Sequence, residues 1–227
     1  MRLSIVIPAL NEAESIQATL QALASARQRA AEVIVVDGGS TDGTVAAAAA
    51  LADQVLAAPQ GRATQLNAGA AVATGDTLLF LHADCCAPAA VDLILAATVG
   101  SRRQAWGRFD VRIQSHRRAL SLVASMMNLR SRLSGIATGD QGIFVTRELF
   151  DRVGGFPVQP LMEDIALSRA LKRVVAPHCL REKIVTSGRR WEQRGVARTI
   201  LLMWRMRLAY FLGADPADLA PRYEHVR

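Results

Sequence analysis

The chain has 227 residues, 51% of them hydrophobic, so it is long and apolar enough to bury a large core and is not expected to be disordered. Its net charge of +7 and isoelectric point near 10.3 come mainly from arginine, which favours phosphate, a nucleotide or an anionic membrane surface as partner. The three cysteines, two of them adjacent, argue against a disulfide framework. No apolar run is as long as a membrane span, which needs about 18 residues. We therefore expect a cytoplasmic protein.

Residues 1–100 alternate between predicted strands and helices. The expected strands lie at residues 3–7, 32–36, around 55 and at 77–81. The first helix is expected to start at Asn11, with Glu14 three residues later as in a capping box, and Pro88 suits the first turn of another helix. Alternation of this kind implies right-handed crossovers and a parallel sheet, so the predicted fold class is α/β.

The pattern changes near Gly100. We expect further strands at residues 106–113 and 142–145, and helices at 116–133, 163–171 and 195–212. We therefore place a soft boundary between a nucleotide half, residues 1–100, and an acceptor half, residues 101–227, within a single domain.

The second predicted strand ends in Asp37, followed by Gly38 and Gly39. A carboxylate there can accept hydrogen bonds from a base or ribose, and the glycines let backbone amides approach a ligand closely. The alternative is a capped turn that only serves the next helix. The spacing is not that of a dinucleotide fold and no P-loop lysine follows it, so those two nucleotide-binding routes are disfavoured.

His82 and Asp84 follow the strand at residues 77–81. Along an extended chain end the imidazole and the carboxylate would face the same way, and divalent cations accept both ligand types. A metal there would offset diphosphate charge and stabilise a departing nucleoside diphosphate as a Lewis acid. The alternative makes His82 a hydrogen-bonded core residue and Asp84 a helix cap.

Glu163 and Asp164 open a predicted helix after the turn at residues 154–157. A carboxylate here could be the base that takes a proton from an attacking hydroxyl. Acidic residues in a first helical turn also favour the helix dipole without any catalytic task, so both interpretations stay open at this point.

Together these segments resemble family 2 glycosyltransferases of the GT-A fold, over roughly residues 3–190. The matching motifs are Pro-Ala-Leu-Asn-Glu at residues 8–12, Val-Val-Asp-Gly-Gly-Ser-Thr-Asp-Gly at 35–43 and the Glu-Asp pair at 163–164. More narrowly, residues 61–67, 80–84 and 138–144 resemble a bacterial subgroup often described, from genomic context, as arsenosugar-biosynthesis-type glycosyltransferases.

The resemblance implies a Rossmann-like, mostly parallel central sheet flanked by helices, a UDP- or GDP-linked sugar donor, a divalent cation (Mn²⁺ or Mg²⁺) and an inverting displacement. By position, the residues expected to contact the nucleotide-sugar are Pro8, Asn11, Glu12, Asp37, Gly39, Arg62 and Asp84. Asp84 with His82 would hold the metal, and Asp164 would be the catalytic base. His82 stands where the wider family more often has aspartate.

Acceptor contacts are expected from Asp140, Gln141, Glu163, Arg190 and Trp191. Asp140 and Gln141 precede a predicted strand and either face sugar hydroxyls or form a simple turn. Arg190-Trp191 resembles the Arg-Trp of the Gln-x-x-Arg-Trp element in processive relatives, although the glutamine is absent. The guanidinium would neutralise diphosphate and the indole would stack on a sugar, whereas ordinary packing is the alternative for Trp191.

The C-terminal helix at residues 195–212 is predicted to be amphipathic. Its apolar face would comprise Ile200, Leu201, Trp204, Leu208 and Phe211. Such a face either packs on its own domain or enters an anionic membrane surface beside a lipid-linked acceptor. Arginines of the helix at residues 116–133 would assist the membrane contact, namely Arg117, Arg118, Arg130 and Arg132.

We therefore expect a metal-assisted, inverting glycosyltransferase that acts on a hydroxyl of a small-molecule or lipid-linked acceptor, in the cytoplasm or at the inner face of the membrane. One alternative is a sugar nucleotidyltransferase, which usually has a glycine-rich basic loop after the first strand, unlike residues 8–12. The other is a non-catalytic, membrane-associated nucleotide-binding scaffold. No nucleic-acid partner is expected, and a homo-oligomer is compatible with the sequence.

Overall fold

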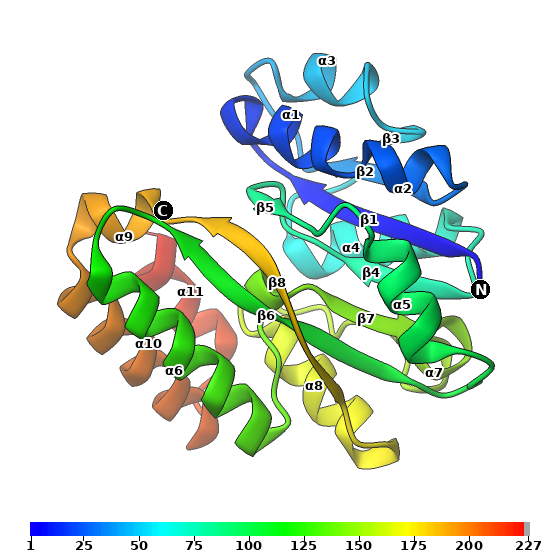
Figure 1. Cartoon of the computed structure of the whole chain (residues 1–227). Coiled ribbons are helices and arrows are strands. Elements are labelled where there is room, and N and C mark those ends of the chain that lie inside the picture. Colours follow the sequence, from blue (N-terminus) through cyan, green and yellow to red (C-terminus); the bar gives the residue numbers. More distant parts are fainter. Residues whose placement is uncertain (225–227) are drawn as a thin grey trace.

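The computed structural model describes residues 1–224, apart from the side chains of residues 190, 193, 194 and 222–224. One eight-stranded sheet runs through the molecule in the order β3-β2-β1-β4-β7-β6-β8-β5, with helices on both of its faces (Figure 1). The fold is α/β, as the alternating sequence pattern predicts.

Four parallel strands form the first part of the sheet. They are β1 (Leu3–Ala9), β2 (Glu32–Asp37), β3 (Gln54–Ala57) and β4 (Thr77–Phe80). The helices between them are α1 (Ala13–Ala22), α2 (Ala24–Gln28), α3 (Thr44–Ala49) and α4 (Arg62–Val72). The predicted strands and their parallel arrangement are confirmed in this part of the chain.

The later strands extend the same sheet. They are β5 (Cys85–Cys86), β6 (Trp106–Gln114), β7 (Ile143–Thr146) and β8 (His178–Ser187). β7 runs antiparallel between β4 and β6, whereas β6 and β8 are parallel. β7 thus joins the two parts of the chain in one sheet. That residues 1–100 bind the nucleotide and residues 101–227 bind the acceptor stays a prediction.

The remaining helices surround the second part of the sheet. They are α5 (Val91–Val99), α6 (Arg118–Ser134), α7 (Arg147–Arg152), α8 (Glu163–Val174), α9 (Arg189–Arg194), α10 (Val196–Phe211) and α11 (Pro216–Glu224). Among residues 1–224, no helix is both long enough and apolar enough to cross a membrane.

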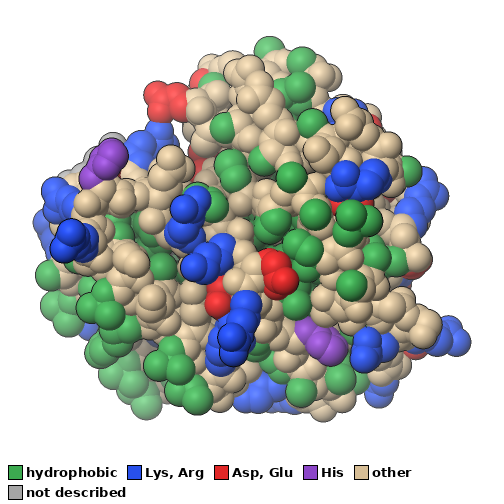
Figure 2. All heavy atoms as spheres, in the orientation of Figure 1, with side chains coloured by type: hydrophobic (Ala, Val, Ile, Leu, Met, Phe, Trp, Pro, Cys, Tyr) green, Lys and Arg blue, Asp and Glu red, His purple; other side chains and the backbone are tan. Residues whose placement is uncertain are grey.

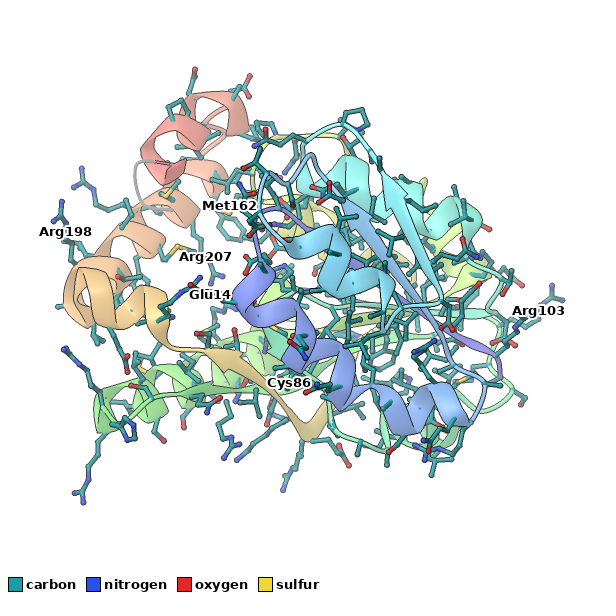
Figure 3. The ribbon with its side chains drawn as sticks, turned by 90° about the horizontal axis from the view of Figure 1, so that it is seen from above. Glu14, Cys86, Arg103, Met162, Arg198 and Arg207 are labelled. Atoms are coloured by element: carbon teal, nitrogen blue, oxygen red, sulfur yellow. The ribbon has the colours of Figure 1, made fainter. Side chains whose placement is uncertain are left out.

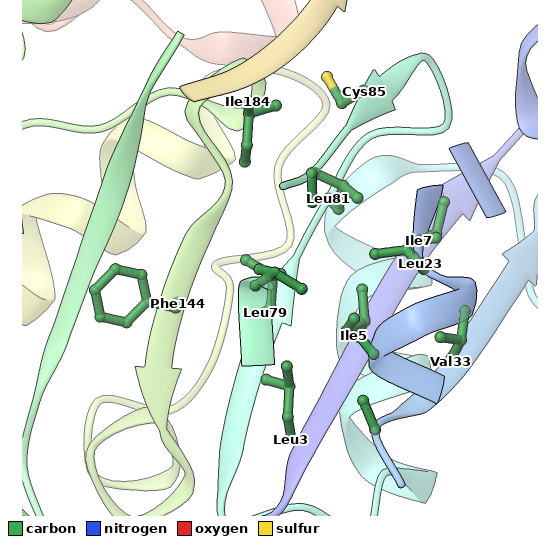
Figure 4. Close-up of a cluster of buried hydrophobic side chains, with 14 of the residues drawn as sticks. Leu3, Ile5, Ile7, Leu23, Val33, Leu79, Leu81, Cys85, Phe144 and Ile184 are labelled. Atoms are coloured by element: carbon green, nitrogen blue, oxygen red, sulfur yellow. The ribbon is translucent and has the colours of Figure 1, made fainter. Parts of the chain in front are cut away.

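Each face of the sheet has its own hydrophobic core, because side chains alternate along the strands. In β1, Ile5 and Ile7 join the core beneath α1 and α5, and Val6 joins the core beneath α4 and α8. Figure 4 shows the first of these cores, where Leu23 and Leu79 lie near the β1 side chains. Burial of each such side chain contributes about 1.5–3 kcal/mol, so the two cores hold the strand ends in fixed positions.

β1 continues past Pro8, where the sequence predicts its end. Pro8 pairs with Val36 of β2, but pairing with β4 stops at Val6. The missing N–H of Pro8 therefore falls outside the β4 ladder, which is why the strand tolerates proline here.

The capping box predicted at Asn11 and Glu14 is wrong. α1 begins at Ala13, whose amide donates to Asp42 Oδ2 (3.2 Å), and the N-cap residue, Glu12, makes no capping hydrogen bond with its side chain. Asn11 instead adopts a left-handed φ of 53° and turns its side chain toward the loop after β2. The predicted apolar face of this helix, Ile16, Leu20 and Leu23, is buried as expected.

The last helices leave two rows of apolar side chains exposed. On α10 these are Leu201, Trp204, Leu208 and Phe211, each more than half exposed (60%, 64%, 61% and 54%). On α6 they are Leu122, Met126, Leu129 and Leu133. Figure 2 shows hydrophobic side chains gathered where α6 and α10 lie in Figure 1. Most of the predicted apolar face of α10 is therefore exposed, although the ring centre of Phe211 lies 5.1 Å from the guanidinium carbon of Arg169 on α8. The buried side chains of this helix include Met206.

Candidate active site

The candidate site lies at the carboxyl edge of the parallel strands, where α/β proteins bind ligands. Asp37 ends β2, and the segment containing His82 follows β4. Phe80 of β4 pairs with Ile143 of the antiparallel β7, so the short helix η1 (Gly139–Gln141), which precedes β7, reaches the same edge. The topology therefore brings together three polar segments that are far apart in the sequence.

The Asp37 carboxylate stabilises its own turn. Its Oδ2 accepts hydrogen bonds from the amides of Gly39 (2.9 Å) and Ser40 (3.0 Å). Gly39 has a φ of +95°, and open space surrounds the position where a Cβ would lie. The glycine is thus required by its backbone conformation, and its open side leaves room for a ligand.

Hydrogen bonds of Asn11 connect the loop after β1 to this turn. Its amide donates to Ser40 Oγ (2.9 Å), and its Oδ1 accepts from the amide of Thr41 (2.9 Å). The amide of the next residue, Glu12, donates to Thr44 Oγ1 (2.8 Å). Residues 11, 12, 37 and 39, all predicted nucleotide contacts, therefore lie in two directly connected loops, and their contact with a nucleotide stays a prediction.

Gln65, which no sequence motif identifies as a functional residue, supports the same region. Its buried Nε2 donates to the carbonyls of Ala9 (2.9 Å) and Val36 (2.8 Å), which joins the ends of β1 and β2. Gln65 lies inside α4, where a glutamine gives no sequence signal of such a role.

His82 and Asp84 do not share one face of an extended chain. β4 ends at Phe80, and the amide of Cys85 donates to the carbonyl of His82 (3.1 Å), which closes a turn over residues 82–85. That expected geometry is wrong because alternation of side chains applies only to extended backbone. The turn instead places His82 Nδ1 3.3 Å from Asp140 Oδ1.

Within the described residues, one cluster has metal-ligand geometry. Ligand atoms of His82, Cys85 and Asp140 lie within 4.8 Å of one another, and Asp84 Oδ1 lies 3.6 Å from Cys85 Sγ. Burial, followed by the charges of Asp84 and Asp140, raises the pKa of the Cys85 thiol well above its usual range. Oxygen and imidazole donors suit Mn²⁺ or Mg²⁺ better than a protonated thiol does, so His82 and Asp140 are the members of this cluster that fit such an ion, and Asp84, the predicted ligand, lies beside the cluster at Cys85.

Gly139 lies between this cluster and Asp164. Its amide donates to Asp164 Oδ2 (2.9 Å), and a Cβ built on it would lie 2.1 Å from His82 Nε2. Only glycine allows such close contact with the imidazole. His82, Gly139, Glu163 and Asp164 line one small cavity, so the structure brings together the predicted metal residue and the predicted base.

Glu163 and Asp164 lie in the first turn of α8 but have different surroundings. Glu163 is 1% exposed and its Oε1 accepts from Arg62 Nη1 (2.9 Å). Burial, followed by the negative charge of Glu163, raises the pKa of Asp164 from 3.8 to about 6, against the opposing effects of the Gly139 amide and Arg62. A carboxyl group with this pKa is close to the range in which a general base works well at neutral pH.

Two predicted acceptor contacts, Gln141 and Trp191, have structural roles of their own. The Gln141 side chain is buried, and its Oε1 accepts from the amide of Thr138 (3.2 Å) in a capping box, which favours the turn alternative. Trp191 packs against the buried cluster that contains Ile113 and Leu120, which favours its packing alternative. The side chain of Arg190 lies outside the described residues.

Comparison of sequences identifies a family. Residues 4–134, more than half of the chain, match the profile described as glycosyl transferase family 2. A search of curated protein sequences gives no match.

Solved structures share the fold. Residues 1–349 of TarS from S. aureus superpose with a TM-score of 0.68 and 20% identity, over 84% of this chain and 61% of that chain. Mannosyltransferase PcManGT from Pyrobaculum calidifontis, in complex with GDP-Man and Mn²⁺, gives 0.64 and 24% identity, over 92% and 61%. Glucosyl-3-phosphoglycerate synthase from Mycobacterium tuberculosis, in complex with Mn²⁺, UDP and glucosyl-3-phosphoglycerate, gives 0.64 and 20% identity, over 94% and 80%.

At these identities the likeness shows the GT-A fold. The chain spans 61% of the length of the first two of these structures.

Proposed function

The chain belongs to glycosyl transferase family 2, and we propose that it transfers a sugar from a nucleoside-diphosphate sugar to a hydroxyl group of an acceptor. The observation that carries this proposal is the position of Gly139, which contacts both His82 and Asp164. His82 of the metal-ligand cluster and Asp164, whose pKa is raised, then line one cavity at the carboxyl edge of the sheet.

The proposed donor is a UDP- or GDP-linked sugar. UDP, UDP-GlcNAc and GDP-Man occur in the complexes of structurally similar proteins. In this chain the connected loops at Asn11 and Asp37 would hold the base and ribose, and Arg62 would face the nucleotide from the start of α4. The narrower resemblance to the arsenosugar-biosynthesis-type subgroup stays a prediction.

A divalent cation, Mn²⁺ or Mg²⁺, fits Asp84, Asp140 and His82. Two of the structurally similar proteins were solved with Mn²⁺. When bound, such an ion would offset the charge of the diphosphate and act as a Lewis acid. In this proposal Asp140 moves from the predicted acceptor contacts to the metal side, because its carboxylate lies 3.3 Å from His82.

Asp164 is the proposed base. The acceptor oxygen attacks the anomeric carbon, the bond from this carbon to the diphosphate breaks, and the diphosphate leaves with the electron pair. The hydroxyl proton passes to Asp164, and attack opposite the leaving group inverts the configuration. The Gly139 amide and Arg62 favour the charged carboxylate, which keeps Asp164 able to accept the proton.

The family and the metal-ligand cluster favour transfer over the two alternatives. Incubation with UDP- or GDP-sugars, Mn²⁺ and candidate acceptors separates them by product. Release of nucleoside diphosphate supports glycosyl transfer, and release of pyrophosphate supports nucleotidyl transfer. Nucleotide binding without either product supports a scaffold.

We also propose that α6 and α10 contact an anionic membrane. The two exposed apolar rows lie on these helices, and the exposed Arg117 and Arg205 add positive charge. Arg130 and Arg132 do not serve this surface as predicted, because Arg130 is largely buried and Arg132 pairs with Asp110 (2.8 Å). Apolar helix faces flanked by cations are typical of interfacial binding.

Flotation with phosphatidylcholine vesicles, with and without phosphatidylserine, tests the membrane contact. We expect binding only to the anionic vesicles, and loss of binding in Leu129→Ser and Trp204→Ser. A stable dimer of the wild type that dissociates in these variants would mean that a second copy of the chain covers the surface instead.

A further inference from the structure

Two arginines close to the candidate site have buried donor atoms without acceptors. Among the described residues, no group accepts from Nε or Nη2 of Arg130 on α6, or from Nε of Arg207 on α10. The buried Arg108 shows the usual arrangement, since its Nε donates to Ser131 Oγ (3.0 Å) and its Nη2 to the carbonyl of Asn128 (3.0 Å). Because an unpaired buried guanidinium is costly, the two arginines call for an acceptor from outside the chain.

Arg130 lies close enough to Asp164 for the charge of that carboxyl group to act on it, and Arg207 lies on α10, which packs against the start of α8. The pKa of Arg130 is lowered by burial and by the charge of Arg108, and the nearby negative charge of Asp164 opposes this. Arg207 follows Met206, which packs against Met162 and Ile165 next to Asp164. In Figure 3, Arg207 lies on the inner side of α10 near Met162, whereas Arg198 of the same helix points away from the molecule.

The free donors match a phosphate group. Nε–H and Nη2–H of Arg130 point from the same edge of the planar guanidinium, so they can bind two oxygens of one anion at once. Nε of Arg207 is a further unpaired donor for an anion. A phosphate group offers three such oxygens and a charge that offsets both cations.

We propose that Arg130 and Arg207 bind a phosphate group of the acceptor beside Asp164. The assignment of this phosphate to the acceptor rests on the proposed function, in which Asp164 takes the proton of the acceptor hydroxyl. The phosphate only anchors the acceptor and takes no part in making or breaking bonds. The donor diphosphate belongs on the other side of Gly139, at His82 and Asp140, whereas the charged groups that act on Arg130 are Asp164 and Arg108.

Calorimetric titration of the full chain with inorganic phosphate, in the presence of saturating UDP or GDP with Mg²⁺, tests the site. We expect Arg130→Gln and Arg207→Gln each to weaken phosphate binding by about tenfold or more, because each loses charge-assisted hydrogen bonds. Arg118→Gln and Arg198→Gln are matched controls, since they remove the same charge from exposed positions of the same helices and should not change the affinity.

Thermal unfolding separates this role from a structural one. Without phosphate, Arg130→Gln should be at least as stable as the wild type, because it removes a largely buried charge whose Nε and Nη2 have no acceptor. With phosphate, the wild type should gain stability and the variant should not. Equal phosphate affinity in both variants and the wild type would overturn the proposal.

Competition distinguishes this proposal from the proposed function. Displacement of phosphate by UDP or GDP with Mg²⁺ would assign the arginines to the donor and overturn the acceptor site. If neither UDP nor GDP binds, the proposed function is wrong. Phosphate binding that depends on the two arginines would still establish the anion site. If dodecyl phosphate binds more tightly than inorganic phosphate, and Arg130→Gln abolishes this binding, the acceptor phosphate belongs to a lipid. If the two bind equally, it belongs to a soluble phosphate ester.

Discussion

The backbone amide of Gly139 donates a hydrogen bond of 2.9 Å to Oδ2 of Asp164, a residue 25 positions later in the chain. The bond fixes one carboxylate oxygen and favours the charged form of the group. Because His82 lies against the same glycine, a small shift of residue 139 would disturb the candidate metal cluster and the candidate base together.

Gly139→Ala should lower both stability and transfer activity. The new Cβ would lie 2.1 Å from His82 Nε2, so the imidazole or the backbone must move. We expect a loss of about 1–3 kcal/mol in the free energy of unfolding, as for other overpacked positions, measured by urea denaturation.

The double variant Gly139→Ala/His82→Ala is the control, because it removes the imidazole that the methyl group meets. It should recover most of the lost stability, giving a clear coupling energy between the two positions. Additive effects of the two changes would show that the contact does not restrict residue 139.

The strands of residues 1–80 were predictable because β-branched and apolar runs, each ended by polar residues, mark buried parallel strands. β8 was not predicted, because its burial depends on pairing with β6 and its middle residues, Arg181 to Lys183, are exposed. Pairing between distant segments leaves no local pattern, so tertiary contacts decided this strand.

Asp84, His82, Asp140, Glu163 and Asp164 were all singled out by motif, and the structure places them around one edge of the sheet. Their grouping was predicted less well. The turn at residues 82–85 and the antiparallel β7 bring Asp140 to His82, and neither follows from spacing along the chain.

Asp84→Asn and Asp140→Asn should each weaken metal-dependent binding of UDP or GDP, on the order of tenfold or more, because each removes an anionic oxygen donor. His82→Ala should have a smaller effect. Titration of the nucleotide with and without Mn²⁺ measures the difference.

Cys85→Ser is the matched control for the metal site, since Cys85 lies in the same cluster but offers sulfur, which Mn²⁺ and Mg²⁺ do not prefer. It should bind the metal–nucleotide complex as the wild type does. A loss as large as that of Asp84→Asn would instead indicate a thiolate ligand and a softer metal.

The transfer rate should depend on pH through Asp164. Burial and the charge of Glu163 raise its pKa to about 6, so the reactive carboxylate forms as the pH rises through this value. We expect the rate to increase by about tenfold per pH unit below this pKa and to level off above pH 7. A rate profile that is flat from pH 5 to pH 8 would contradict the assignment of Asp164 as the base.

Asp164→Asn should reduce transfer by about a hundredfold or more and leave nucleotide affinity nearly unchanged. The amide oxygen can still accept from the Gly139 amide, but the group cannot take a proton at neutral pH. Turnover and nucleotide binding measured on the same preparation check this, with Asp151→Asn as an exposed control on α7. Near-normal turnover would eliminate Asp164 as the base and direct attention to Glu163.

The same variant should be more stable than the wild type at neutral pH. The folded-state pKa of Asp164 is raised, so the folded protein binds more protons than the unfolded chain between the ordinary value of 3.8 and about 6. The wild type therefore loses stability as the pH rises through this window, by up to about 2–3 kcal/mol, and Asp164→Asn does not. Unfolding midpoints should diverge above pH 6 and converge near pH 4, and equal midpoints at both pH values would show that the folded protein does not perturb this carboxyl group.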